Sequence, residues 1–142
     1  MHTHHEYVTA RRPELERWAR ELGADGVRYI QVQFPDLLGS LRTKICPLAK
    51  GLAPEGDGLS TALFSCCHGD GEPIGVPVFE APVGGFANGL PNYISIADPA
   101  TVIRLPWQPD TAAVITNATR TDGEACPLDA RAQLAGIAQQ AA

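Results

Sequence analysis

The residues of this sequence that are best suited to chemistry are its cysteines and histidines, yet their spacing matches no known site. The four cysteines contain no C-x-x-C pair: Cys46, Cys66, Cys67 and Cys126. A zinc site would have to combine residues without a recognised ligand spacing, namely Cys66, Cys67 and His68 with His2, His4 and His5. In a reducing compartment, buried small hydrophobic residues are the simpler interpretation of the cysteines. A solvated terminus is the simpler interpretation of the histidines.

The acidic segment Gly69–Glu72 invites a calcium interpretation, but it lacks the alternating oxygen ligands and the terminal Glu of an EF-hand loop. We therefore predict a turn there. The sequence contains no P-loop, no dinucleotide-binding glycine motif, no nucleophile elbow and no H-E-x-x-H zinc motif. Without any family resemblance, these residues favour a domain that holds another component in place over one that is catalytic itself.

The composition excludes several classes of protein. A formal charge of −5 and a pI near 5.2 give no electrostatic footprint for nucleic acid. The long uncharged run between Glu80 and Asp98 is interrupted by prolines and glycines, so it cannot form a continuous membrane helix. Charged residues between Met1 and Arg20 occupy the place of the apolar stretch of a signal peptide, so we expect a cytoplasmic protein.

The first half of the chain predicts a helix followed by a hairpin. Pro13 suits the first turn of a helix whose apolar stripe is formed by Leu15, Trp18, Ala19 and Leu22. The segment 27–34 alternates apolar and polar residues and predicts a half-buried strand. After a turn at 35–39, the alternation of 41–45 predicts a second strand that pairs with the first.

The second half predicts further strands and a terminal helix. Residues 59–67 suit a short strand, 68–91 form a long Gly- and Pro-rich loop, and 93–97, 101–105 and 112–119 predict strands. Asp129 is placed to cap a helix with Leu134, Ile137 and Ala138 on one side. Without regular βαβ alternation, the fold class is α+β: a small mixed sheet covered by a helix on one face. The other face would be left for loops or another chain.

Two sets of motifs resemble the glutamine synthetase family. The first is the hairpin from Val27 to Lys44, in which a hydrophobic strand leads to Asp36, Gly39 and a basic strand. The second is a series of four short motifs that is similar, in order and spacing, to a series of motifs in that family. Here the motifs read Asp98-Pro99-Ala100-Thr101, Leu105-Pro106-Trp107, Asp122-Gly123-Glu124 and Asp129-Ala130-Arg131. Together the matches span residues 13–134.

The resemblance is to the family's small N-terminal β-grasp domain. It implies a flexible tail at 1–12, the β-grasp domain at 13–127 and, at 128–142, a terminal helix that starts a catalytic domain absent from this sequence. In the family, that domain holds ATP and two or three Mg²⁺ or Mn²⁺ ions. ATP activates glutamate as γ-glutamyl phosphate, and ammonia or an amine displaces the phosphate. We therefore expect this chain to bind no cofactor alone.

The resemblance also implies site residues, because the small domain lends a loop to the catalytic domain of a neighbouring subunit. That loop usually reads Phe-Asp-Gly-Ser-Ser, and its Asp binds ammonium. The nearest match here is Gly56-Asp57-Gly58-Leu59-Ser60, which keeps the Asp-Gly and one Ser. Asp57 is thus the candidate for binding the amine, with Ser60 beside it. The alternative is an ordinary Asp-Gly turn.

Relatives that use larger amines often lack the full motif, so the resemblance implies that residues 65–92 shape the nucleophile pocket. The candidates to face it are Phe64, His68, Asp70, Phe79, Phe86 and Asn92. The aromatic residues could stack on an amine, or they could hold the loop on the sheet. Trp107 is assigned to packing.

These inferences lead to two hypotheses of different classes. In the first, the chain is the small subunit of a split glutamine-synthetase-like ligase. A separate catalytic chain would complete a hetero-oligomeric ring and join glutamate or a similar carboxylate to ammonia or an amine. In the second, it is a non-catalytic β-grasp module that binds and regulates a full-length synthetase, or a truncated fragment. Neither involves nucleic acid or a membrane.

Overall fold

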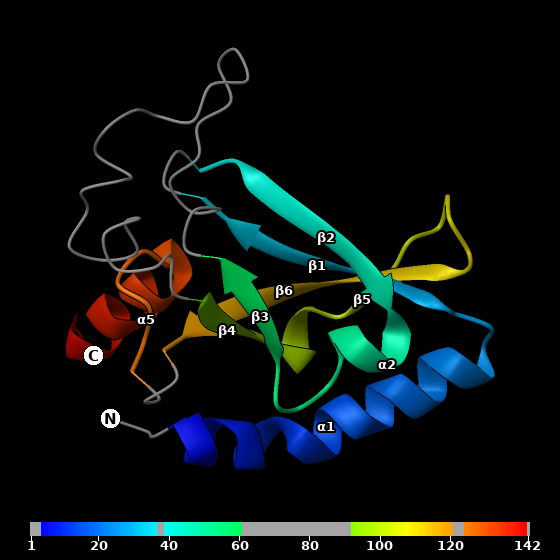
Figure 1. Cartoon of the computed structure of the whole chain (residues 1–142), viewed down its shortest axis with the longest axis horizontal. Coiled ribbons are helices and arrows are strands. Elements are labelled where there is room, and N and C mark those ends of the chain that lie inside the picture. Colours follow the sequence, from blue (N-terminus) through cyan, green and yellow to red (C-terminus); the bar gives the residue numbers. More distant parts are fainter. Residues whose placement is uncertain (1–3, 37–38, 61–91, 121–123, 142) are drawn as a thin grey trace.

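The computed structural model describes residues 4–36, 39–60, 92–120 and 124–141. These residues form helices around one curled, mixed sheet (Figure 1). In chain order the elements are α1 (His4–Ala24), β1 (Tyr29–Pro35), β2 (Leu41–Pro47), α2 (Leu48–Gly51), β3 (Asp57–Ser60), β4 (Asn92–Ala97), the 3₁₀ turn η2 (Pro99–Thr101), β5 (Ile103–Arg104), β6 (Thr111–Thr119) and α5 (Ala130–Ala141). The α+β class and the small β-grasp-like sheet are confirmed.

Helix α1 begins earlier than the sequence predicts. The predicted start at Pro13 is wrong, because α1 already begins at His4 and includes Pro13 in its interior. A proline there leaves the carbonyl one turn earlier without its helical donor and costs about 3 kcal/mol. Burial of Val8 on the same stripe as Leu15 and Leu22 offsets part of that cost.

The sheet has the strand order β2-β1-β6-β4-β3, and β5 pairs with β6. The predicted hairpin of β1 and β2 is confirmed, with Val32 opposite Lys44 and Phe34 opposite Arg42. Strand β6 lies in the middle, parallel to β1 and antiparallel to β4 and β5. The predicted strand 101–105 is shorter than expected because Asp98 accepts from the amide of Ala100 and caps η2.

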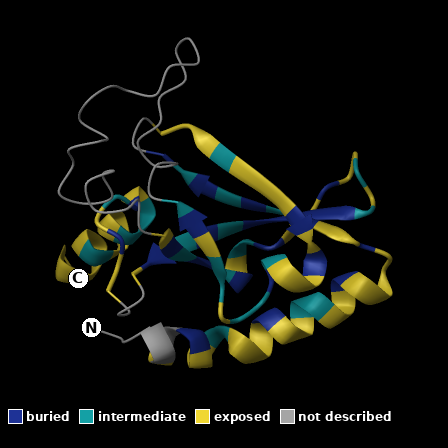
Figure 2. Cartoon of the chain, viewed as in Figure 1, coloured by how far each residue is buried: buried dark blue, intermediate teal, exposed yellow. Residues whose placement is uncertain are grey.

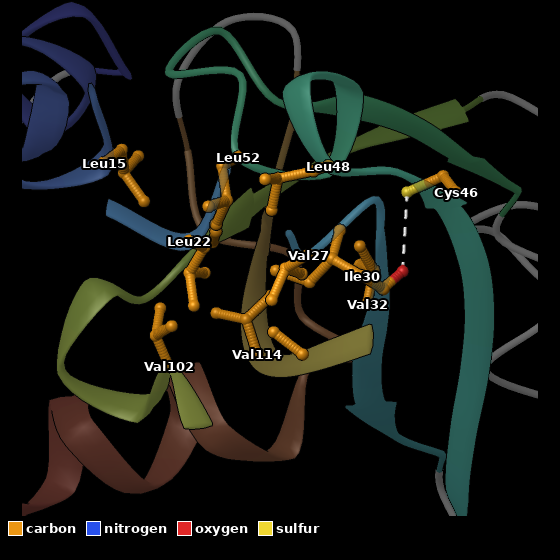
Figure 3. Packing of buried hydrophobic residues seen from close by; sticks show 12 residues of the cluster. Leu15, Leu22, Val27, Ile30, Val32, Cys46, Leu48, Leu52, Val102 and Val114 are labelled. Atoms are coloured by element: carbon orange, nitrogen blue, oxygen red, sulfur yellow. Dashed lines mark hydrogen bonds between the residues drawn. The ribbon is translucent and has the colours of Figure 1, made fainter. Parts of the chain in front are cut away.

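The face of the sheet that α1 covers is called the inner face. Its core is a cluster in which Leu15 and Leu22 of α1 meet Ile30 and Val32 of β1 (Figure 3). A second cluster, around Phe34, Leu59, Tyr93, Ala118 and Cys126, continues the inner face toward the other end of the strands. Cys46 and Cys126 are both buried, which agrees with their interpretation as small hydrophobic residues. Burial raises the pKa of both thiols.

Among the described residues, the opposite, outer face is open over β2 and β5 and half-buried over most of β1. The exposed residues there include Leu41 and Ile45 of β2, and Figure 2 shows most of β2 in the yellow of exposed residues. Trp107, which precedes β6, is 77% exposed, so its assignment to packing is wrong. Within the described part, no helix is both long and apolar enough to cross a membrane.

Helix α5 is fixed to the sheet by its first turn. The Asp129 carboxylate is buried and accepts hydrogen bonds from the amides of Ala118, Arg131 and Ala132. This confirms the predicted cap and also joins the helix to β6. The Arg131 guanidinium pairs with Asp98 Oδ2 at 2.6 Å, so two separate motifs of the series meet in space. Farther along the helix, Leu134 and Ile137 are exposed.

Candidate functional site

Asp57 is the first residue of β3 and lies on the inner face of the sheet. Its register partner on β4 is Ser95, and Leu59 on the same side of β3 is buried in the second cluster. The Asp57 carboxylate Oδ2 is 2.5 Å from Lys44 Nζ and 3.5 Å from Lys50 Nζ. The other oxygen, Oδ1, accepts from the amide of Gly58 at 3.0 Å. Asp57 is therefore held by ammonium groups from β2 and α2.

These contacts set the charge of Asp57. The hydrogen bond from Lys44 is the main reason that the pKa of Asp57 is lowered, and the charge of Lys50 and the Gly58 amide act in the same direction. Partial burial opposes them. Asp57 is thus a carboxylate at neutral pH, which suits it to bind a cation. An incoming ammonium group would compete with two lysines for the same oxygen.

Ser95 is the polar neighbour of Asp57 on β4. Its Oγ is buried and has no hydrogen-bond partner among the described residues. Register places Ser95 directly opposite Asp57, where paired Cβ atoms are roughly 5 Å apart. The backbone leading into Asp57 fits tightly against the same strand: Gly56 has a φ of +77°, and a Cβ there would lie 2.5 Å from the Ser95 carbonyl oxygen.

Ser60 and Asn92 lie together, apart from Asp57. They are register partners at the ends of β3 and β4 where the chain leaves and re-enters the sheet. Because side chains alternate along a strand, both belong to the outer face, whereas Asp57 belongs to the inner face. The structure thus brings together two of the predicted residues and separates them from the third.

The other candidates lie outside the described residues: Phe64, His68, Asp70, Phe79 and Phe86. Their assignment to the nucleophile pocket stays a prediction. So does the predicted strand beyond Ser60. In the described part of the chain, no group of three or more His, Cys, Asp or Glu residues could hold a metal ion.

Sequence reasoning missed Lys44, Lys50 and Ser95. The alternation of β2 contained a signal for Lys44, because that residue faces the same side as Arg42 and Cys46. Only the register of the hairpin, however, shows that this side is the inner one. Lys50 and Ser95 gave no signal, because their closeness to Asp57 depends on α2 and on the pairing of β3 with β4.

Comparisons with known proteins find similarity in structure only. No family model matches the sequence, and no curated protein matches it. A structure titled "GmaS/ADP complex-Conformation 1" is similar with a TM-score of 0.60 and 23% identity over 87% of this chain. A second, "Apo GmaS without ligand", has a TM-score of 0.62 and 22% identity over the same share.

The match covers 25% of the length of each GmaS chain, so this chain spans about a quarter of these proteins. GmaS is γ-glutamylmethylamide synthetase, a member of the glutamine synthetase family. At this level of identity the likeness establishes the fold. The chain therefore has the fold of one quarter of a glutamine synthetase family protein, which confirms in structure the resemblance drawn from its sequence.

Proposed function

We propose that this chain is the small subunit of a split glutamine-synthetase-like ligase. In this proposal it completes, in trans, the amine pocket of a separate catalytic chain. The observation that carries the proposal is the fold: 87% of the chain superposes on a quarter of GmaS. The reaction is the ATP-dependent joining of glutamate, or a similar carboxylate, to ammonia or an amine. The proposal assigns ATP and Mg²⁺ or Mn²⁺ to the catalytic chain, and it keeps the cytoplasmic location predicted from the sequence.

Within that pocket we assign Asp57 to binding the amine as its ammonium ion. A carboxylate with a lowered pKa binds a cation well but is a weak proton acceptor. Its role is therefore to hold the ammonium, and removal of the proton falls to another group. Lys50 is the more distant of the two lysines, at 3.5 Å, so we expect it to be the one that the substrate displaces.

The test begins with the native mass of the protein in its own cells and identification of the chains bound to it. Release of ADP from ATP is then measured with glutamate and ammonium or methylamine, using the purified catalytic chain with and without this one. The proposal requires that activity rises when this chain is added. A lone species of 15.1 kDa, or a complex without an ATP-using chain, would contradict it.

A pair of matched variants tests the role of Asp57. Asp57→Asn removes the charge and should raise the KM for the amine by about 10- to 100-fold, the range of a lost charge-assisted hydrogen bond. Asp110→Asn is the control, because Asp110 also has a lowered pKa and pairs with an arginine, Arg28, but lies far from Asp57 along the sheet. Equal activity of both variants would rule out the binding role.

A second candidate function is a non-catalytic interaction module. The open outer face of the sheet favours it, because Leu41 and Ile45 are exposed there. Such a module would leave the activity of a full-length synthetase unchanged or lower it. The same assay therefore distinguishes the two, because only a small subunit raises the activity.

A further inference from the structure

Among the residues that the structure describes, no strand pairs with the outer edge of β2. Strand β2 is last in the strand order, and among the described strands it pairs with β1 alone (Figure 1). The amide of Leu48 donates to the carbonyl of Arg28, and the amide of Asp36 donates to the carbonyl of Ser40. In an antiparallel pair, residues that exchange hydrogen bonds alternate with residues that do not. These two bonds therefore show that every second residue of β2, including Arg42 and Lys44, exchanges hydrogen bonds with β1.

It follows that the alternate residues direct their N–H and C=O groups away from β1. These are Leu41, Thr43 and Ile45, whose side chains lie on the outer face. Leu41 is 55% exposed and Ile45 is 60% exposed. Within the described part of the chain, the edge therefore presents strand hydrogen-bonding groups without a partner, beside exposed aliphatic side chains.

Charges that would normally protect such an edge are turned away from it. Native proteins discourage edge pairing with charged side chains, lysine in particular. Here Arg42 and Lys44 lie on the inner face and are paired within the chain, Arg42 with Asp36 at 2.6 Å and Lys44 with Asp57 at 2.5 Å. Their charges are thus balanced before any second chain approaches.

None of the described outer-face positions of the strands next to this edge is a charged residue, and the Arg28 guanidinium, which lies over the Tyr29 ring, is paired with Asp110. The outer-face positions of β1, β2, β5 and the first half of β6 are Tyr29, Gln31, Gln33, Pro35, Leu41, Thr43, Ile45, Pro47, Ile103, Thr111, Ala113 and Ile115. Since each chain carries a net charge of −5, two copies approach each other with the least repulsion through an uncharged region such as this.

We propose that the occupant of the edge is a second copy of this chain, paired antiparallel through β2 about a two-fold axis at Thr43. In this register each Thr43 exchanges two hydrogen bonds with its counterpart, and each Leu41 lies opposite Ile45 of the second copy. All of the outward-directed groups of Leu41, Thr43 and Ile45 are then bonded. The result is one continuous sheet through both copies. This contact does not depend on the proposed ligase role.

The test is the mass of the full-length chain across a concentration series, measured by sedimentation equilibrium. The wild type should approach twice the 15.1 kDa of one chain. Ile45→Lys places a charge beside the edge and should abolish the dimer. Ile103→Lys is the matched control and should leave the dimer intact, because Ile103 is 57% exposed on the same face but belongs to β5.

Hydrogen exchange distinguishes the edge contact from others. The amides of Leu41, Thr43 and Ile45 should become protected as the dimer forms, and the Ile45→Lys variant should lose that protection while the amides of β1 and β6 keep theirs. A wild-type chain that stays monomeric throughout the series overturns the proposal. Loss of the dimer in both lysine variants overturns it too, because that result means that the two copies pack through the outer faces of their sheets and not through the edges of β2.

Discussion

Lys44 on β2 and Asp57 on β3 form an ion pair at 2.5 Å, although their strands lie at opposite ends of the sheet. The contact is possible because the sheet curls until its two edge strands approach each other across the inner face. Short helix α2 follows β2 and brings Lys50 to the same carboxylate. The ion pair therefore connects the two edges of the sheet.

The first prediction concerns the energy of this connection. In a double-mutant cycle of Lys44→Met and Asp57→Asn, we expect a coupling of about 0.5 to 1 kcal/mol in the free energy of unfolding, because both side chains are partly exposed to solvent. The corresponding cycle with Lys50→Met should give a smaller coupling, since Lys50 is 1 Å farther away. Urea denaturation measures both, and equal couplings would contradict the prediction.

The second prediction concerns acid. The pKa of Asp57 is lowered in the folded chain from its ordinary value of 3.8, so the unfolded chain binds the proton more readily. The stabilisation is complete above that ordinary value and is lost as the pH falls through the folded pKa. Urea denaturation at a series of acidic pH values should therefore show a weaker pH dependence in Asp57→Asn than in the wild type. Parallel profiles would show that Asp57 contributes nothing.

The third prediction concerns Gly56. Gly56→Ala should cost about 2 to 4 kcal/mol, because its φ of +77° is unfavourable to alanine and its new Cβ would meet the Ser95 carbonyl oxygen. Gly26→Ala is the control, since Gly26 has a φ of +83° but no atom of a described residue within 4 Å of an added Cβ. Gly26→Ala should therefore cost only about 1 kcal/mol. Thermal unfolding compares the two, and similar losses would show that close packing is unimportant.

The fourth prediction concerns the attachment of α5. Asp129→Ala removes the acceptor for three amides and leaves the buried amide of Ala118 without a partner. We expect a loss of about 2 to 3 kcal/mol in the free energy of unfolding. Hydrogen exchange should show faster exchange in α5 than in β1. Asp129→Asn keeps one acceptor oxygen and should lose less, and a loss as large as that of alanine would contradict this account.

The fifth prediction contrasts the two tryptophans. Trp107 is 77% exposed, so Trp107→Ala should change the free energy of unfolding by less than about 0.5 kcal/mol. Trp18 packs against the core beside α1's buried leucines, so Trp18→Ala should cost roughly 2 to 3 kcal/mol. Acrylamide should quench the fluorescence of Trp107 more efficiently than that of Trp18. The reverse order would indicate that Trp107 is covered.

Elements with local signals could be predicted from the sequence. The hairpin of β1 and β2, the strands at β4 and β6 and the Asp129 cap depend on neighbouring residues, and all are confirmed. The helix start was wrong because Pro13 signals a first turn, whereas burial of Val8 extends α1 beyond it. Tertiary packing outweighed a local preference at that point.

Features that depend on register could not be predicted. The alternation of β2 would favour Leu41 and Ile45 as buried residues, yet they are exposed, and Lys44 shares the inner face with Val32. The hairpin turn decides this, because Asp36 pairs with Ser40 and Gly39 supplies a φ of +79°. A shift by one residue would exchange the two faces. The lysine partners of Asp57 follow from that register.

The central place of β6 governs when this chain can fold. Its parallel partner β1 lies far upstream, and Arg28 and Asp110, which pair where the two strands begin, are 82 positions apart. During synthesis on the ribosome, β1 and β2 emerge long before β6. Until β6 is available, the backbone N–H and C=O groups on one edge of β1 therefore lack their strand partner. A sheet closed by its last strand has a high contact order and assembles slowly. Chaperone demand should therefore peak just before residues 111–119 leave the exit tunnel.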